Sequence, residues 1–139
     1  MALILDTGPL VASLDEDDNM HAACRRLIEE ETERLVLPAP VIAEVTYFAE
    51  QRLAQKDLVA FIEDLATGRY VVEDLRMEDY ARAAEICERY ADARVGFVDA
   101  AVLSVVERLD ERKLATLDHR HFGLLRPRHV DALELLPAL

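Results

Sequence analysis

Cysteine is scarce in this sequence, and its placement argues against a small domain that depends on disulfide bonds or on a cysteine-bound metal. Cys24 and Cys87 are the only two, and they lie far apart in helix-like segments without the spacing of a metal site. We therefore expect both to be small, partly buried apolar residues in a reducing compartment. A chain of 139 residues can bury a core large enough to fold without such cross-links.

Long apolar runs and linker-like stretches are also missing. No run is long enough to cross a bilayer, and the strand-like Ala2-Leu3-Ile4-Leu5 lacks the basic start and long apolar run of a signal peptide. No fixed-period repeat and no Pro/Gly/Ser-rich linker divides the chain. With 52% hydrophobic and 32% charged residues, we expect one globular domain over residues 1–139, cytoplasmic and without membrane association.

Basic residues are outnumbered, with 16 Lys and Arg against 28 Asp and Glu and a net charge of −12. This balance argues against a general nucleic-acid binder, which normally carries a basic face. The segment 119–129 is different, because it holds three of the four histidines and no acid. Its arginines are either contacts for RNA phosphates or ordinary surface residues; they are Arg120, Arg126 and Arg128.

Short apolar segments alternate with amphipathic ones along the chain. Strands are expected at residues 2–5, 34–37, 70–72, 114–117 and 133–136. Helices are expected at residues 9–14, 21–28, 41–53, 58–65, 78–90 and 97–109, with Asp17 or Asp18 capping the second. This alternation predicts an α/β fold with a mainly parallel sheet, whose sites form beyond the carboxyl ends of the strands.

Most of the acids suit solvated helix faces, but two share a face with core residues. Glu44 follows Val41 by three residues and precedes Phe48 by four, which places all three on one side of a helix. Asp99 precedes Val102 by three residues, which also places these two on one side of a helix. Both carboxylates therefore lie in or beside apolar stripes.

Two further acids, Asp6 and Asp118, directly follow apolar strands. Asp6 and Asp99 have no basic residue within four positions. An unpaired buried carboxylate is costly, and grouping several adds repulsion. A hard cation such as Mg²⁺ or Mn²⁺ would resolve this cost, because it favours carboxylate oxygens. The residues alone leave a second explanation equally open, namely four unrelated caps and turn residues.

These acids and their neighbours resemble the PIN domain family, specifically the VapC-type toxins of bacterial toxin–antitoxin pairs. The resemblance covers nearly the whole chain. The matching blocks are Leu5-Asp6-Thr7, Pro40 to Val45 around Glu44, Gly96-Phe97-Val98-Asp99-Ala100-Ala101, and Ala115-Thr116-Leu117-Asp118 followed by Arg120, His121 and Phe122.

The resemblance implies a three-layer α/β/α fold and a Mg²⁺- or Mn²⁺-dependent endoribonuclease. Its metal ligands would be Asp6, Glu44, Asp99 and Asp118, with the hydroxyls of Thr7 and Thr116 beside them and Thr116 counted with the catalytic residues. A metal-activated water would cleave an RNA phosphodiester, in an RNA of the tRNA or rRNA class. The toxin would form a homodimer and be neutralised by a cognate VapB-type antitoxin.

Several alternatives remain at this stage. A non-catalytic module of the same fold would use the acids for structure, and a DNA or flap nuclease would share the metal chemistry. A phosphatase-like hydrolase usually needs a second Asp where Gly8 stands. If the segment were extended, His119 and His121 would share a face and suggest zinc, although no third ligand has suitable spacing. A histidine-based, metal-free ribonuclease would leave the four acids unexplained.

Overall fold

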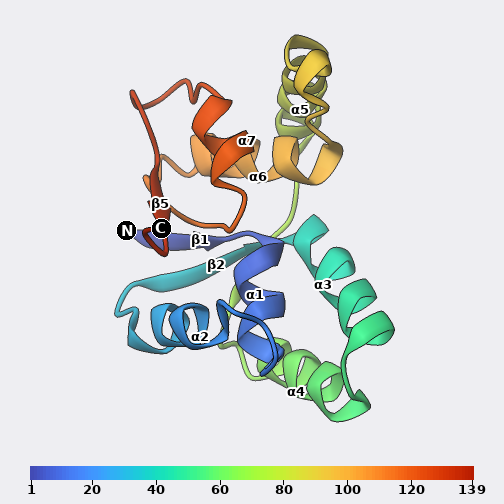
Figure 1. Ribbon diagram of the computed structural model, residues 1–139. Helices are drawn as coiled ribbons and strands as arrows, with labels where there is room; N and C mark the ends of the chain where they lie inside the picture. The colour runs from blue at the N-terminus through green and yellow to red at the C-terminus, as the bar shows by residue number, and fades with distance from the viewer.

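A computed structural model describes all 139 residues (Figure 1). Its centre is a five-stranded sheet in the order β3-β2-β1-β4-β5, in which every neighbouring pair is parallel. The strands are β1 (Ala2–Leu5), β2 (Arg34–Pro38), β3 (Val71–Glu73), β4 (Lys113–Ala115) and β5 (Glu134–Leu136). The predicted α/β architecture with a mainly parallel sheet is therefore confirmed.

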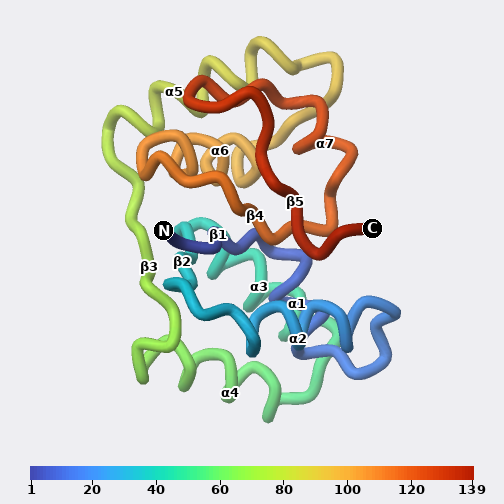
Figure 2. The backbone as a smooth tube through the Cα atoms, turned by 90° about the vertical axis from the view of Figure 1, so that its left-hand side faces the viewer, coloured from blue at the N-terminus to red at the C-terminus, as the bar shows by residue number.

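Helices cover both faces of this sheet. They are α1 (Thr7–Leu14), α2 (His21–Glu30), α3 (Ala39–Arg52), α4 (Gln55–Ala66), α5 (Met77–Arg89), α6 (Phe97–Arg108) and α7 (His119–Leu124), with a 3₁₀ turn at Ala91–Ala93. In Figure 1, α1, α2 and α4 lie below the sheet and α5, α6 and α7 above it, while α3 stands at the end toward which β1 points. Figure 2 shows the strands between the two helical layers. None of the helices combines the length and the apolar character that a membrane span requires.

The position of β1 at the centre of the sheet explains why its sequence is uniformly apolar. All four residues of β1 are fully buried, because helices pack on both of its faces. They belong to a core that also includes Leu103 of α6 and Leu114 of β4. Pro9 and Pro40 lie in the first turns of α1 and α3, where a missing amide hydrogen costs nothing.

The strand order places a topological switch between β1 and β4. From β1 the chain continues to β2 on one side, whereas β4 pairs on the other side. The Asp6 amide donates to the Ala115 carbonyl oxygen at 2.9 Å, so the pairing continues to the end of both strands. A side chain at Gly8 would approach the Leu117 Cβ within 3.1 Å, so glycine lets α1 start close beside the end of β4.

The segment after β4 differs from the expectation. The strand ends at Ala115 rather than Leu117, and the chain then forms helix α7, which the sequence pattern did not predict. The Asp118 side chain accepts the His121 amide hydrogen at 3.0 Å and caps this helix. A helix of six residues is too short to show a clear apolar period in the sequence.

The start of α2 also differs from the prediction. The helix begins at His21, and its N-cap is Met20 rather than Asp17 or Asp18. The Asp18 carboxylate instead accepts the Met20 amide hydrogen at 2.8 Å. Asp18 thus stabilises the turn that precedes the helix.

Candidate metal centre

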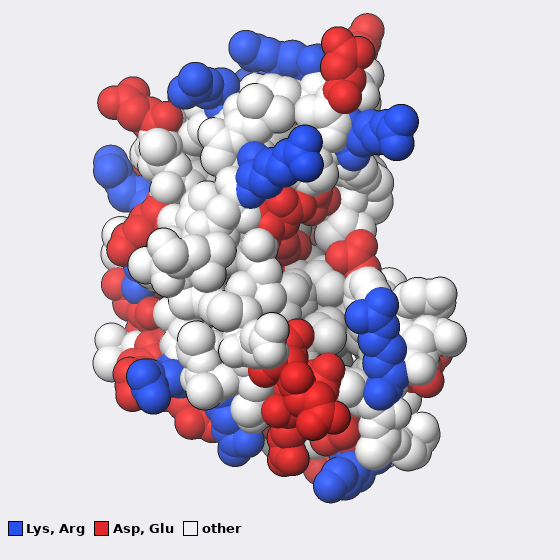
Figure 3. Space-filling view, in the orientation of Figure 1, with Lys and Arg blue, Asp and Glu red and all other residues white.

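The four acids predicted from the sequence line one open cleft of about 450 Å³ at the carboxyl end of the sheet. Asp6 follows β1, Asp118 caps α7, Glu44 lies in α3 and Asp99 lies in the first turn of α6. Figure 3 shows acidic side chains gathered in a hollow of this face, with basic side chains around it. Elements that are distant in sequence therefore bring these carboxylates together at the switch point of the sheet.

Asp6 is the most buried of the four, with 5% of its surface exposed. Its Oδ2 accepts a hydrogen bond from the Thr116 hydroxyl at 2.8 Å, and the Thr116 oxygen accepts the Asp118 amide hydrogen at 3.0 Å. The pKa of Asp6 is raised from 3.8 to about 6, mainly by burial and to a smaller extent by the charges of Asp99 and Glu44, while its hydrogen bonds act in the opposite direction. Thr116 thus connects two of the predicted acids.

Asp99 and Asp118 form a tighter group with His121, in which one potential ligand atom of each lies within 4.8 Å of the others. The His121 Nδ1 is 2.8 Å from the Asp118 Oδ2 and 3.5 Å from the Asp99 Oδ2. Its Nε2 donates to the Ala93 carbonyl oxygen at 3.0 Å. Because that carbonyl can only accept, the Nε2 carries a hydrogen and the Nδ1 faces the two carboxylates.

The charges in this group shift one another. Burial and the Asp118 charge raise the pKa of Asp99 above its usual value. Burial by itself would lower the pKa of His121, but the hydrogen bond and charge of Asp118 raise it overall, with a contribution from Asp99. A protonated His121 therefore partly neutralises these two acids when no cation is bound.

Sequence reasoning did not place His121 in the site. The extended segment in which His119 and His121 would share a face does not form, because both residues belong to α7. The His119 Nε2 instead donates to the Thr116 carbonyl oxygen at 3.0 Å. The missed signal was an Asp followed three residues later by His at a helix start, where both side chains can meet.

The residues of the cleft fit a hard divalent cation. None of the four acids forms an ion pair with Lys or Arg, whereas the buried Asp79 pairs with Arg108 at 3.0 Å. The hydroxyl of Thr7, which lines the same cleft, is buried without a hydrogen-bond partner. Several carboxylates with an unused hydroxyl are oxygen ligands of the kind that Mg²⁺ and Mn²⁺ favour.

One basic side chain, Arg52, lies along the cleft. Glu44, Phe48 and Arg52 follow one another at four-residue intervals on one face of α3, and all three line the cleft. The Arg52 guanidinium lies over the Phe48 ring, 5.1 Å from its centroid. An anionic ligand held at the carboxylates by a cation would therefore meet an aromatic ring and a positive charge further along the helix.

Comparisons with known proteins agree with this fold. The profile of the PIN domain family matches residues 3–125. A curated relative, Ribonuclease VapC26 of Mycobacterium tuberculosis, is 34% identical over 125 residues, which are 90% of this chain and 93% of the relative. The chain belongs to the PIN domain family. Within that family, it is homologous to the VapC ribonuclease toxins.

Solved structures share the fold. The crystal structure of Mycobacterium tuberculosis VapC20, described as a toxin that cleaves the sarcin–ricin loop, has a TM-score of 0.78 at 19% identity and covers 93% of this chain and 98% of its own. A DNA-bound VapBC complex from Salmonella typhimurium contains a chain with a TM-score of 0.71 at 20% identity, covering 97% and 98%. The predicted three-layer arrangement is therefore confirmed.

Proposed function

We propose that this chain is a divalent-metal-dependent endoribonuclease and the toxin of a type II toxin–antitoxin pair. The observation that carries the proposal is the group of uncompensated carboxylates at the switch point of the sheet, in a chain homologous to VapC ribonucleases. A non-catalytic module would have no reason to group the buried Asp6 with Asp99 and Glu44, whose charges repel it. The cation would be Mg²⁺ or Mn²⁺, since the available ligands are oxygens.

In this proposal Asp6 and Asp99 hold the cation, and Glu44 and Asp118 complete the acidic pocket. When bound, the cation neutralises phosphate charge and activates the attacking water. Thr116 holds the Asp6 carboxylate in place through its 2.8 Å hydrogen bond. His121 is a positioning residue, because its ring binds the Asp118 carboxylate on one side and the Ala93 carbonyl oxygen on the other.

The substrate that we propose is RNA of the tRNA or rRNA class. The name of the VapC26 relative describes a ribonuclease, and VapC20 is described as cleaving the sarcin–ricin loop. Arg52 and Phe48, which continue the cleft beyond the carboxylates, suit a phosphate and a base respectively. We expect this activity in the cytoplasm.

We also propose a VapB-type antitoxin as partner and a homodimer as the toxin's state. The Salmonella structure is a VapBC complex. The net charge of −12 favours a basic partner, because opposite charge accelerates association. An antitoxin Arg that entered the cleft would meet the same carboxylates as the cation, and would therefore weaken metal binding.

Cleavage of RNA by the purified chain with Mg²⁺, Mn²⁺ or EDTA tests the proposal. We expect activity with a divalent cation, none in EDTA, and a loss of about 100-fold or more in Asp99→Asn. Asp131→Asn is the matched control, because this exposed acid lies outside the cleft. Undiminished cleavage in EDTA or by Asp99→Asn would rule out the metal mechanism.

A further inference from the structure

A second hollow, of about 490 Å³, lies between the C-terminal part of α5 and the segment after α7. We call it the arginine groove. Its charged lining residues are Arg82, Arg89, Arg126, Arg128, Glu85 and Glu88. They leave a surplus of positive charge in a chain whose net charge is −12, and no large apolar side chain lines the groove.

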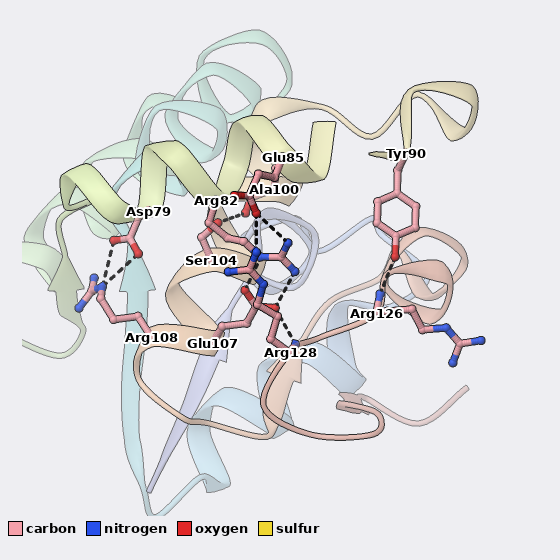
Figure 4. Close-up of polar contacts among 10 residues, drawn as sticks. All are labelled: Asp79, Arg82, Glu85, Tyr90, Ala100, Ser104, Glu107, Arg108, Arg126 and Arg128. Carbon is pink, nitrogen blue, oxygen red and sulfur yellow. Dashed lines mark hydrogen bonds and ion pairs between the residues drawn. The ribbon is translucent and has the colours of Figure 1, made fainter. Parts of the chain in front are cut away.

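Two of these arginines fix the walls of the groove (Figure 4). The Arg82 guanidinium donates to both carboxylate oxygens of Glu107, at 2.8 and 3.0 Å. The Arg128 amide donates to the same carboxylate at 2.8 Å, and its guanidinium pairs with Glu85. Helices α5 and α6 and the segment after α7 are therefore joined at one nearly buried carboxylate, and Arg128 is engaged in local ion pairs.

The other two arginines, Arg89 and Arg126, form no ion pair, and Tyr90 contacts the side chain of the first and the backbone of the second. The Arg126 amide donates to the Tyr90 hydroxyl at 3.0 Å, and the Arg89 guanidinium lies over the Tyr90 ring, 5.5 Å from its centroid. Figure 4 shows the Arg126 side chain extending away from Tyr90 without a polar contact. The Arg126 backbone is thus anchored beside Arg89, and both guanidinium groups are free of ion pairs.

The arginine groove is connected to the metal centre through two short segments. Helix α7 begins at its cap Asp118 and ends two residues before Arg126. Six helical residues and a short extension span on the order of 10–15 Å. The segment 90–93 provides a second link, because Tyr90 anchors Arg126 and the Ala93 carbonyl accepts from His121.

We propose that Arg89 and Arg126 bind phosphates of the RNA strand a few nucleotides from the bond that is cleaved. This inference rests on the proposed function. The planar guanidinium matches phosphate oxygens, and phosphate contacts position a strand without reading its sequence. The lack of apolar lining favours a phosphate backbone over a protein, whose interfaces have an apolar centre.

Steady-state cleavage of a long single-stranded RNA, and of an RNA too short to reach from the cleft to the groove, tests this subsite. We expect the double variant Arg89→Gln/Arg126→Gln to raise KM for the long RNA about tenfold without changing kcat, and to flatten the salt dependence of log KM by about 1.4, or about 0.7 per lost phosphate contact. Cleavage of the short RNA should not change.

The matched control is Arg34→Gln/Arg112→Gln, which makes the same change in net charge. Both residues are exposed at the amino ends of β2 and β4, whereas the cleft lies at the carboxyl ends of the strands. The proposal is overturned if both double variants behave alike, or if the groove variant impairs short and long RNA equally. Normal RNA kinetics with weakened binding of antitoxin or of a second copy would instead make the groove a protein interface.

A wild-type chain that cleaves neither RNA would contradict the proposed function but not yet the subsite. Fluorescence anisotropy of the long RNA in EDTA then decides the question, because it measures binding without cleavage. Several-fold weaker binding by the groove variant than by the control variant supports the subsite, and equal binding overturns it.

Discussion

At the scale of single residues, three buried acids show how a carboxylate can be accommodated in this fold. Asp79 is 2% exposed and pairs with Arg108, while Glu111 is 6% exposed and accepts the Ala2 amide hydrogen at 3.0 Å. Asp6 is equally buried but has only the Thr116 hydroxyl and its neighbouring backbone. Unlike the other two, Asp6 is also repelled by the charges of Asp99 and Glu44, a cost that a cation would offset.

The stability of the metal-free chain should depend on the protonation of Asp6. Its pKa rises from 3.8 to about 6 on folding, so between these values the folded state binds more protons than the unfolded state. Stability is then lost as the pH rises through this range. Asp6→Asn does not titrate, and above pH 6 it should exceed wild type by up to about 3 kcal/mol in free energy of unfolding, with little difference below pH 4.

Urea unfolding in EDTA at several pH values measures this difference. Asp131→Asn, at an exposed position, should follow wild type at every pH. A less stable Asp6→Asn at high pH would show that the Asp6 carboxylate serves folding.

At the scale of elements, the site depends on how the ends of β1 and β4 meet the start of α7. Thr116 is fully buried, and its hydroxyl donates to Asp6 and accepts the Asp118 amide hydrogen. The partners Thr116 and Asp6 are 110 residues apart in sequence. One hydroxyl therefore holds the carboxylate that follows β1 against the cap of α7.

Thr116→Val should weaken both the fold and the metal site, because it removes a hydrogen bond from Asp6 and leaves the Asp118 amide without its acceptor. We expect a loss of about 1–3 kcal/mol in free energy of unfolding. The hydrogen bond from Thr116 lowers the pKa of Asp6, so its removal should shift the pH dependence of Mn²⁺ binding upward. Calorimetric titration over a pH series measures that shift. Thr116→Ser keeps the hydroxyl and should restore the wild-type profile, which a purely packing role would not require.

At the scale of the whole molecule, the fold and the metal centre are energetically separable. A cluster of 24 buried apolar residues forms the core, and the acids lie beyond the carboxyl ends of the strands. We therefore expect the chain to stay folded in EDTA, unlike small zinc domains that unfold without metal. The acidic cleft then lowers stability until a cation binds.

Addition of Mn²⁺ should stabilise the wild-type chain by about 2.7 kcal/mol at a concentration 100 times its Kd. Thermal unfolding at increasing Mn²⁺ measures this as a rising Tm. The Asp6→Asn/Asp99→Asn variant should show almost no rise. An equal rise in that variant would place the stabilising cation at another site.

Local pattern and tertiary structure contributed differently to what could be predicted. The buried strands and amphipathic helices have periods that sequence reveals, and β1 is uniformly apolar because both faces are covered. Helix α7 was missed because it is short and its cap is visible only as a side-chain contact. His121 was missed as a site residue for the same reason.

By itself, the sequence determined the alternation of strands and helices, and it singled out four acids beside apolar segments, because periodicity and local charge are properties of neighbouring residues. Only the tertiary structure decided which acids have counter-charges and which do not. Asp79 and Arg108 are 29 residues apart, and Arg82 and Glu107 are 25 apart. Such partners meet through the packing of α5 on α6, so no local pattern distinguishes their carboxylates from the uncompensated ones around Asp6.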